Sequence, residues 1–200
     1  MNIGIDLDEV LCEFLDGVLR FHNDIYGTNL VKEHFTSYMF WNHWGGTKQQ
    51  AIDKVLDFYK SEYYSNLEIV PYSQKILTEL SIHHSLYLIT SRQNVVKEST
   101  IQRLNKNYLN CFKGFYFTNA YSNSGSESKK SIYCDKLKID LMIEDSVEHA
   151  LDCSLSSNKV LLLDKPWNQD FFDKDNKISR VNDWLEIKSY IENISTGINI

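Results

Sequence analysis

Four short runs of nearly continuous apolar residues stand out in the hydrophobic pattern of the chain. They cover residues 3–5, 86–89, 141–143 and 160–163, and three aromatic residues at 115–117 form a similar run. Short runs without polar alternation are typical of strands that are buried on both faces. The pattern therefore predicts four buried strands and a candidate fifth at 115–117.

Helical periodicity fills most of the intervals between these strands. Apolar residues recur three or four positions apart at residues 76–80, 95–108, 132–137 and 184–194. An alternation of strands and helices is typical of a parallel sheet with right-handed crossover connections. The chain is thus predicted to have an α/β fold, with a Rossmann-like parallel sheet and helices on both of its faces.

One segment, residues 12–70, interrupts this alternation. It contains helical patterns near residues 14–22 and 51–59 without a strand-like run, and residues 11–70 hold 12 of the chain's 26 aromatic residues. Aromatic side chains in this number give a small helical unit enough bulk for its own core. We therefore expect a small all-helical insert at 12–70, within an α/β core formed by residues 1–11 and 71–200. The polar run at 121–128 predicts a connecting loop, and the last six residues a frayed end.

The composition limits the cellular environments and the classes of partner that are expected for the protein. The 200 residues are 42% hydrophobic and 24% charged, with a formal net charge of −6. No run approaches the roughly 20 apolar residues that span a bilayer, and no export signal is visible at the start. The four cysteines form no CxxC pair, which argues against a zinc site and favours reduced thiols in the cytoplasm. The negative charge disfavours a nucleic-acid polymer, but a metal ion could neutralise a small phosphate ester locally.

Polar side chains follow three predicted strands at their carboxyl ends, the edge at which open parallel sheets bind ligands. Taken singly, such residues are more often turn or helix-cap residues. Together, the four carboxylates would repel one another unless a cation lay among them, and hard oxygen ligands select Mg²⁺. The residues concerned are Asp6, Asp8, Glu144, Asp145, Thr90, Ser91 and Arg92.

The order of these residues resembles the four motifs of the haloacid dehalogenase superfamily of phosphohydrolases. Residues 6–10 match the first motif, DxDx[TV] after an apolar strand, and Thr90 matches the hydroxyl residue that ends the next strand. Lys130 matches the lysine of the third motif and stands 14 residues before Glu144, whereas Lys129 is the alternative register. The acidic pair at 144–145 matches the fourth motif.

A narrower resemblance is to the 5'(3')-deoxyribonucleotidase-like branch. Residues 139–146 and 160–168 carry it, and that branch has an all-helical cap just after the first motif, where residues 12–70 lie. Two residues depart from the pattern: Glu9 stands where the best-known nucleotidases have Gly, and Arg92 where they often have Pro. These departures bear on the nucleotide substrate and leave the expected fold intact.

The resemblance implies a role for each motif residue. Asp6 is the expected nucleophile, which becomes an aspartyl phosphate, and Asp8 is the expected general acid and base. The second aspartate distinguishes the phosphatases of the superfamily from the dehalogenases. Thr90 is expected to donate its hydroxyl to the phosphate, and Lys130 to neutralise the phosphate and reduce the repulsion among the carboxylates.

The implied cofactor is Mg²⁺. Its expected ligands are the carboxylates of Asp6 and Asp145 and the backbone carbonyl of Asp8. Glu144 is expected to bind the ion directly or to hold a water molecule of the ion; both arrangements stay open.

The implied substrate contacts come from two places. Backbone N–H groups of Leu7, Asp8 and Ser91 form an anion nest, with Arg92 beside them. Aromatic residues of the insert are the candidates for contact with a ring of the leaving group. These aromatic residues are Phe14, Phe40, Trp41 and Trp44.

The resemblance implies a Mg²⁺-dependent phosphatase that hydrolyses a small phosphate monoester, in the first place a nucleoside or deoxynucleoside monophosphate. A phosphatase for a sugar or cofactor phosphate and a phosphomutase are alternatives within the superfamily. A catalytically inactive relative that binds only metal or phosphate is an alternative of another class. The oligomeric state, including a homodimer, stays open.

Overall fold

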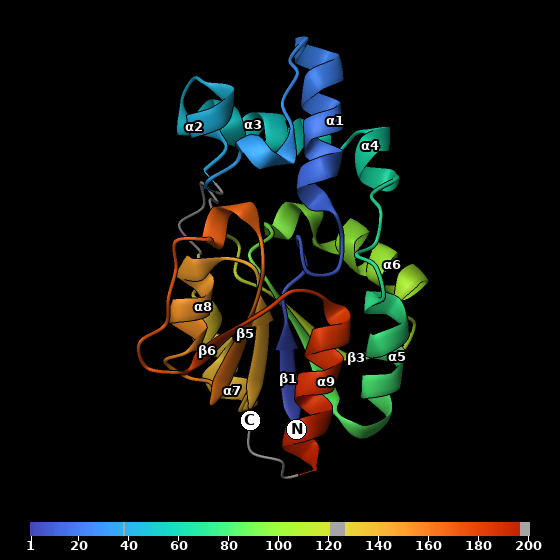
Figure 1. The fold of residues 1–200 in the computed structure, drawn as a ribbon. Helices are drawn as coiled ribbons and strands as arrows, with labels where there is room; N and C mark the ends of the chain where they lie inside the picture. Colours follow the sequence, from blue (N-terminus) through green and yellow to red (C-terminus); the bar gives the residue numbers. More distant parts are fainter. Residues whose placement is uncertain (38, 121–126, 197–200) are drawn as a thin grey trace.

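The computed structural model describes residues 1–37, 39–120 and 127–196, and these residues contain one parallel sheet (Figure 1). The strand order is β3-β2-β1-β4-β5-β6, and every neighbouring pair is parallel. The predicted α/β fold with a parallel sheet is therefore confirmed. The strands are β1 (Asn2–Ile5), β2 (Ser85–Thr90), β3 (Phe112–Phe117), β4 (Leu141–Glu144), β5 (Lys159–Leu163) and β6 (Ile178–Val181).

The five predicted strands all form, but β6 was not predicted. Its four residues read Ile-Ser-Arg-Val, and only Ile178 and Val181 are buried. β6 lies at the edge of the sheet, and β5 is its one partner among the described strands. Ile178 and Val181 belong to the clusters on opposite faces of the sheet, and the two polar residues between them interrupt the continuous apolar run that identified the buried strands.

Hydrophobic clusters cover both faces of the sheet, as the strand–helix alternation predicts. Successive residues of β4 point to opposite faces, because Leu141 and Ile143 belong to one cluster and Met142 to the other. The first cluster includes residues of α5, α6 and α9, and the second includes residues of α7 and α8. These helices are α5 (Ser73–His83), α6 (Lys97–Asn107), α7 (Lys130–Leu137), α8 (Val147–Cys153) and α9 (Trp184–Ser195).

The segment between β1 and α5 is helical and lies over the carboxyl ends of the strands (Figure 1). Phe58 lies near its centre, with ring centroids 5.4 Å from Phe14 and 5.8 Å from Phe21. These rings belong to the same hydrophobic cluster as Ile3 of β1, so the core continues from the sheet into the helical segment. The helices are α1 (Phe14–Tyr26), α2 (Trp41–Trp44), α3 (Lys48–Phe58) and α4 (Glu62–Ser65), with a 3₁₀ turn η1 (Lys32–His34).

Two sequence predictions fall partly on residues outside the described ranges. Residues 121–126 make up most of the loop predicted at 121–128, and residues 197–200 most of the predicted frayed end. None of the helices formed by the described residues has the length and apolar character to cross a membrane.

Candidate active site

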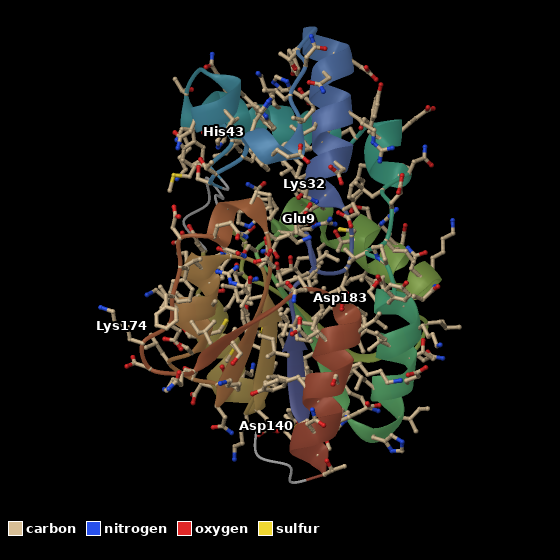
Figure 2. All side chains as sticks on the ribbon, viewed as in Figure 1. Glu9, Lys32, His43, Asp140, Lys174 and Asp183 are labelled. Carbon is tan, nitrogen blue, oxygen red and sulfur yellow. The ribbon has the colours of Figure 1, made fainter. Side chains whose placement is uncertain are left out.

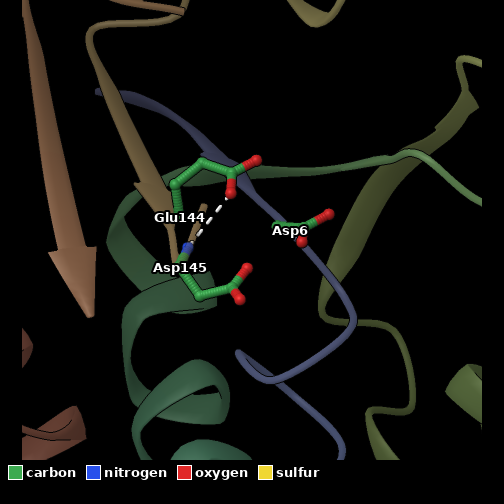
Figure 3. Close-up of side chains that lie close together, drawn as sticks. All are labelled: Asp6, Glu144 and Asp145. Carbon is green, nitrogen blue, oxygen red and sulfur yellow. Dashed lines mark hydrogen bonds between the residues drawn. The ribbon is translucent and has the colours of Figure 1, made fainter. Parts of the chain in front are cut away.

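Three buried carboxylates meet where β1 and β4 end (Figure 3). One oxygen from each of Asp6, Glu144 and Asp145 lies within 4.8 Å of the others. The strands bring them together because β1 and β4 are neighbours, with Ile5 paired to Ile143. The N–H of Asp6 donates to the Ile143 carbonyl at 3.0 Å, which continues this pairing for one more residue. The predicted meeting of the first and fourth motifs is thus observed.

Lys130, the first residue of α7, supplies a cation to this cluster. Its Nζ donates to Asp6 Oδ1 at 2.6 Å and also to Glu144 Oε1. The Lys130 side chain is only 1% exposed, whereas Lys129 is exposed. Of the two predicted registers, the structure therefore has Lys130 against the carboxylates.

The carboxylates still outnumber the cations of the cluster. Burial, followed by the charges of Glu144 and Asp8, raises the pKa of Asp6 to about 7, although Lys130 opposes the rise. Burial, and then Glu144 and Asp6, raise the pKa of Asp145. Asp145 makes no ion pair with any described residue. A buried set of hard oxygen donors with excess negative charge fits a divalent cation such as Mg²⁺.

Backbone and side-chain donors fix the orientation of the acidic pair. Glu144 Oε2 accepts the N–H of Asp145 at 3.0 Å, the dashed line in Figure 3, and that of Ser146 at 3.2 Å. Asp145 Oδ2 accepts from the indole Nε1 of Trp167 at 3.0 Å, and the Asp145 carbonyl accepts from the side-chain amide of Asn168 at 2.9 Å. The turn after β5 therefore holds Asp145 in place.

Asp8 is bound by Arg92, which follows β2. The guanidinium donates from Nε to Asp8 Oδ2 at 3.1 Å and from Nη2 to Oδ1 at 2.6 Å. Arg92 was expected to contact the substrate, but its polar atoms are directed at Asp8 and at neighbouring hydroxyl groups. Thr90 is buried at the end of β2, and its Oγ1 accepts the N–H of Arg92 at 3.2 Å.

A histidine that the sequence did not indicate lies beside the second motif. His149 Nε2 of α8 is 2.9 Å from Ser91 Oγ. Burial, and then the nearby Lys130 ammonium, lower the pKa of His149 to about 4. The helical position of His149, four residues after Asp145, carries no signal that separates it from a surface residue.

The low pKa of His149 predicts that this side chain destabilises the folded protein as pH falls. Between pH 6.5 and 4 the unfolded chain binds a proton at this imidazole that the folded chain does not, so His149 lowers the free energy of unfolding as pH falls. Asp6, whose pKa is raised, contributes with the opposite sign. Between pH 7 and pH 5 this contribution of His149 lowers the free energy of unfolding by about 2 kcal/mol. Urea unfolding at the two pH values should show that, on going from pH 7 to pH 5, the free energy of unfolding of the His149→Gln variant changes by about 2 kcal/mol more favourably than that of the wild type. Equal pH dependence in both proteins would contradict the prediction.

Two cavities adjoin the carboxylates. The first, the acidic groove, contains Asp6, Asp145, His149 and Trp167 in its wall. The second, the apolar pocket, lies between the helical segment and the sheet, and Asp8 and Ser91 line both cavities. The other walls of the apolar pocket are Phe14, Phe40, Trp41, Ala51, Ile52, Val55, Leu56, Tyr59, Arg92, Gln93 and Ala120.

The four aromatic residues predicted to contact substrate do not share one location. Phe14, Phe40 and Trp41 line the apolar pocket. Trp44 instead stacks on Phe40 with ring centroids 4.7 Å apart and on His22 at the same distance. Leu7, predicted for its backbone N–H, has a buried side chain in the hydrophobic core.

Glu9 connects the helical segment to the core (Figure 2). Its side chain is fully buried, and its Oε2 lies 2.6 Å from Lys32 Nζ of η1 and 3.4 Å from Lys165 Nζ after β5. Its Oε1 accepts the N–H of Leu15 at 2.6 Å. Glu9 also has a φ of 63°, a left-handed conformation that favours glycine. The departure from Gly was visible in the sequence, but its lysine partners were not.

Solved structures resemble this fold over nearly its whole length. A predicted phosphatase from Clostridium acetobutylicum has a TM-score of 0.71 at 14% identity, covering 96% of this chain and 98% of that chain. A haloacid dehalogenase-like family hydrolase from Streptococcus pneumoniae has a TM-score of 0.63 at 17% identity, covering 95% of this chain and 97% of that chain. The fold is therefore that of the haloacid dehalogenase-like hydrolases, as the four motifs predict.

Sequence comparison defines the family more narrowly. The model of the family described as "5' nucleotidase, deoxy (Pyrimidine), cytosolic type C protein" matches residues 1–196, and the chain belongs to this family. A "Putative 5'(3')-deoxyribonucleotidase" from Staphylococcus epidermidis is 22% identical over an alignment of 201 positions, which covers 96% of this chain and 97% of the relative. A nucleotidase from Clostridium acetobutylicum is 22% identical over 194 residues, and the match covers 97% of this chain and 95% of the relative. The predicted nucleotidase branch is confirmed, and the protein is a phosphoric monoester hydrolase.

Proposed function

We propose that the protein is a Mg²⁺-dependent phosphatase that hydrolyses a nucleoside or deoxynucleoside monophosphate through an aspartyl phosphate on Asp6. One observation carries the proposal: the acidic groove and the apolar pocket meet at Asp8. A phosphate beside Asp6 and a ring in the apolar pocket would then belong to one small molecule. The names of the relatives from Staphylococcus and Clostridium support a nucleotide as that molecule.

The cation would be held by the carboxylates of Asp6 and Asp145 and by the backbone carbonyl of Asp8. Glu144 would bind it directly or through water. When bound, Mg²⁺ withdraws negative charge from the phosphoryl group and fixes its orientation.

The protein's own residues carry the two displacements. A carboxylate oxygen of Asp6 attacks phosphorus, the ester P–O bond breaks, and its electron pair leaves with the ester oxygen, which takes the proton of Asp8. Water then attacks phosphorus and gives a proton to Asp8. The P–O bond to Asp6 breaks, its electron pair returns to the carboxylate, and inorganic phosphate is released.

The remaining motif residues bind the phosphate in this proposal. The Thr90 hydroxyl and the backbone N–H groups of Leu7, Asp8 and Ser91 donate hydrogen bonds to its oxygens. Lys130 is already paired with both Asp6 and Glu144 and lies between them. In addition, it neutralises part of the negative charge of the phosphate. Charge-assisted donors of this kind bind phosphate more strongly than neutral ones.

Residues 12–70 act in this proposal as a cap over a core of residues 1–11 and 71–200. The cap carries most walls of the apolar pocket, including Phe14 and Trp41, on which a base can stack. It also shields the reacting groups from bulk water. The four cysteines are free and buried in the structure, which agrees with action in the reducing cytoplasm.

A substrate panel tests the proposal. Purified protein is assayed with and without Mg²⁺ on deoxynucleoside 5'- and 3'-monophosphates, ribonucleotides, sugar phosphates and p-nitrophenyl phosphate. We expect turnover that requires the metal and the highest kcat/KM for nucleotides. A preference for sugar phosphates would replace the nucleotide in the proposal, and metal or phosphate binding without any turnover would support an inactive binding module.

Removal of one metal ligand should be visible without an activity assay. The Asp145→Asn variant is expected to bind Mg²⁺ at least about tenfold more weakly, because a neutral amide replaces a carboxylate that forms no ion pair within the described part of the chain. Isothermal titration calorimetry with MgCl₂ measures the change. Asp164→Asn is a matched control, since Asp164 also follows a strand but pairs with Arg180. Equal affinities for Mg²⁺ in the two variants would exclude Asp145 as a ligand.

A further inference from the structure

Asp8 occupies the position between the acidic groove and the apolar pocket. Asp6 and Asp145 line only the groove, whereas Phe14 and Trp41 line only the pocket. A monoester with its phosphate in the groove and its organic part in the pocket has its bridging oxygen at the junction. A proton donor for the leaving oxygen must lie within hydrogen-bond reach of that point.

Arg92 fixes the direction of the Asp8 carboxylate. Its Nε and Nη2 contact the two carboxylate oxygens in a fork, and the Cys12 thiol lies 3.4 Å from Oδ1. Such bidentate pairs restrict rotation of a carboxylate as well as stabilising it. Among the described contacts, Oδ2 accepts only from Nε, so it keeps a lone pair for a proton.

The guanidinium of Arg92 is itself fixed by hydrogen bonds and by contacts with aromatic rings. Its Nη1 donates to Tyr64 OH at 2.9 Å and to Thr100 Oγ1 at 3.0 Å, and its Nη2 also contacts the Cys12 sulfur at 3.6 Å. The guanidinium lies 5.3–5.7 Å from the ring centroids of three aromatic residues, and Arg92 is only 4% exposed. Each of its five N–H groups therefore has a protein acceptor, and none is left for a phosphate. These aromatic residues are Phe14, Tyr59 and Tyr64.

We propose that Arg92 is a positioning residue that holds the Asp8 carboxyl group in line with the leaving oxygen of the substrate. This inference rests on the proposed function. Arg92 transfers no proton: as the ester P–O bond breaks, the proton of Asp8 moves to the leaving oxygen, and Arg92 keeps the donor aligned. Its link to Tyr64 of α4 makes the alignment depend on the helical segment being in place over the sheet.

The proposal predicts a dependence on the leaving group. A nucleoside leaves as a strongly basic alkoxide and needs the proton, whereas p-nitrophenolate leaves readily without one. We expect Arg92→Met to lower kcat/KM for deoxythymidine 5'-monophosphate about 100-fold, the usual size of a general-acid contribution, and that for p-nitrophenyl phosphate less than about tenfold. KM for the nucleotide should change little, because no contact to the substrate is removed.

A double-mutant comparison separates positioning from direct phosphate binding. If Arg92 acts through Asp8, then adding Arg92→Met to Asp8→Asn causes almost no further loss with the nucleotide, because the group that it positions is already gone. If Arg92 binds phosphate directly, the two losses multiply and KM rises. Multiplying losses, or equal losses with both substrates, would overturn the proposal.

Two further variants keep the test decisive. Arg92→Lys keeps the positive charge but not the two-pronged hydrogen bonding to Asp8, so we expect a smaller loss of kcat/KM with the same leaving-group dependence. If thermal unfolding shows that Arg92→Met does not fold, Arg92→Lys takes its place in the test. Arg103→Met is the control: Arg103 also contacts the end of α4, but it donates to the backbone carbonyls of Ser65 and Leu67 and not to Asp8. Its leaving-group dependence should match that of the wild type.

The proposed function and this inference fail in different ways. Wild-type protein that hydrolyses neither substrate in Mg²⁺ would refute the phosphatase proposal. Wild-type activity with a leaving-group dependence in Asp8→Asn, but none in either Arg92 variant, would refute only the role of Arg92.

Discussion

Replacement of Asp6 by asparagine should reduce the turnover of a phosphate monoester by about 10⁴-fold or more. The amide is close to the carboxylate in shape but is a far weaker nucleophile, and losses of this order follow the removal of covalent nucleophiles in other enzymes. The fold should survive because Lys130 keeps its contact with Glu144. The expected result is therefore a folded protein without turnover.

The measurement compares kcat of Asp6→Asn, Asp164→Asn and the wild type in saturating Mg²⁺. Asp164→Asn makes the same chemical change at the end of β5, outside the carboxylate cluster, and should retain most activity. Mass spectrometry of acid-quenched wild-type protein should in addition find a phosphoryl group on Asp6. Turnover by Asp6→Asn within tenfold of the wild type would mean that another group attacks phosphorus.

The site residues that could be predicted are those that lie at the carboxyl ends of the predicted strands. Asp6, Thr90 and Asp145 each follow an apolar run, and parallel strands bring their carboxyl ends to one edge. Adjacent strands in the observed order, β2-β1-β4, then bring the motif residues together without further information. Backbone topology alone therefore accounts for the meeting of the first and fourth motifs.

The part that could not be predicted depends on pairs of side chains that are distant in the sequence. The two departures from the nucleotidase pattern, Glu9 and Arg92, are both buried and both ion-paired. Asp8 and Arg92 are 84 residues apart, and Lys32 reaches Glu9 from within the helical segment. Periodicity shows which face of an element is buried, but it does not show which buried charge meets which partner.

Both departures share a physical consequence. A buried charge is tolerated only when a partner compensates its loss of hydration. Glu9 in place of Gly is matched by Lys32 of the helical segment, and Arg92 in place of Pro is matched by Asp8 and by Tyr64 of α4. Each therefore ties the helical segment to the edge of the sheet where the acidic groove lies. The two departures from the nucleotidase pattern are thus also connections between the helical segment and the sheet.

Loss of Lys130 is expected to have the largest effect on stability. In metal-free protein, Lys130→Met leaves Asp6 and Glu144 buried without their shared cation, and breaking a buried ion pair from one side costs about 3–5 kcal/mol. Urea unfolding in EDTA should show this decrease. Lys129→Met, which removes an exposed charge one residue earlier, should change the free energy of unfolding by less than about 0.5 kcal/mol.

Two further measurements, one with a second substitution and one with added Mg²⁺, identify the cause of that destabilisation. The second change in Lys130→Met/Glu144→Gln removes one of the uncompensated carboxylates, so part of the lost stability should return. Millimolar Mg²⁺ should stabilise Lys130→Met more than it stabilises the wild type, because the ion then supplies the only positive charge among Asp6, Glu144 and Asp145. A decrease in stability that neither addition reduces would mean that the lysine contributes packing rather than charge, and the view of this edge as a balance of anions and cations would be wrong.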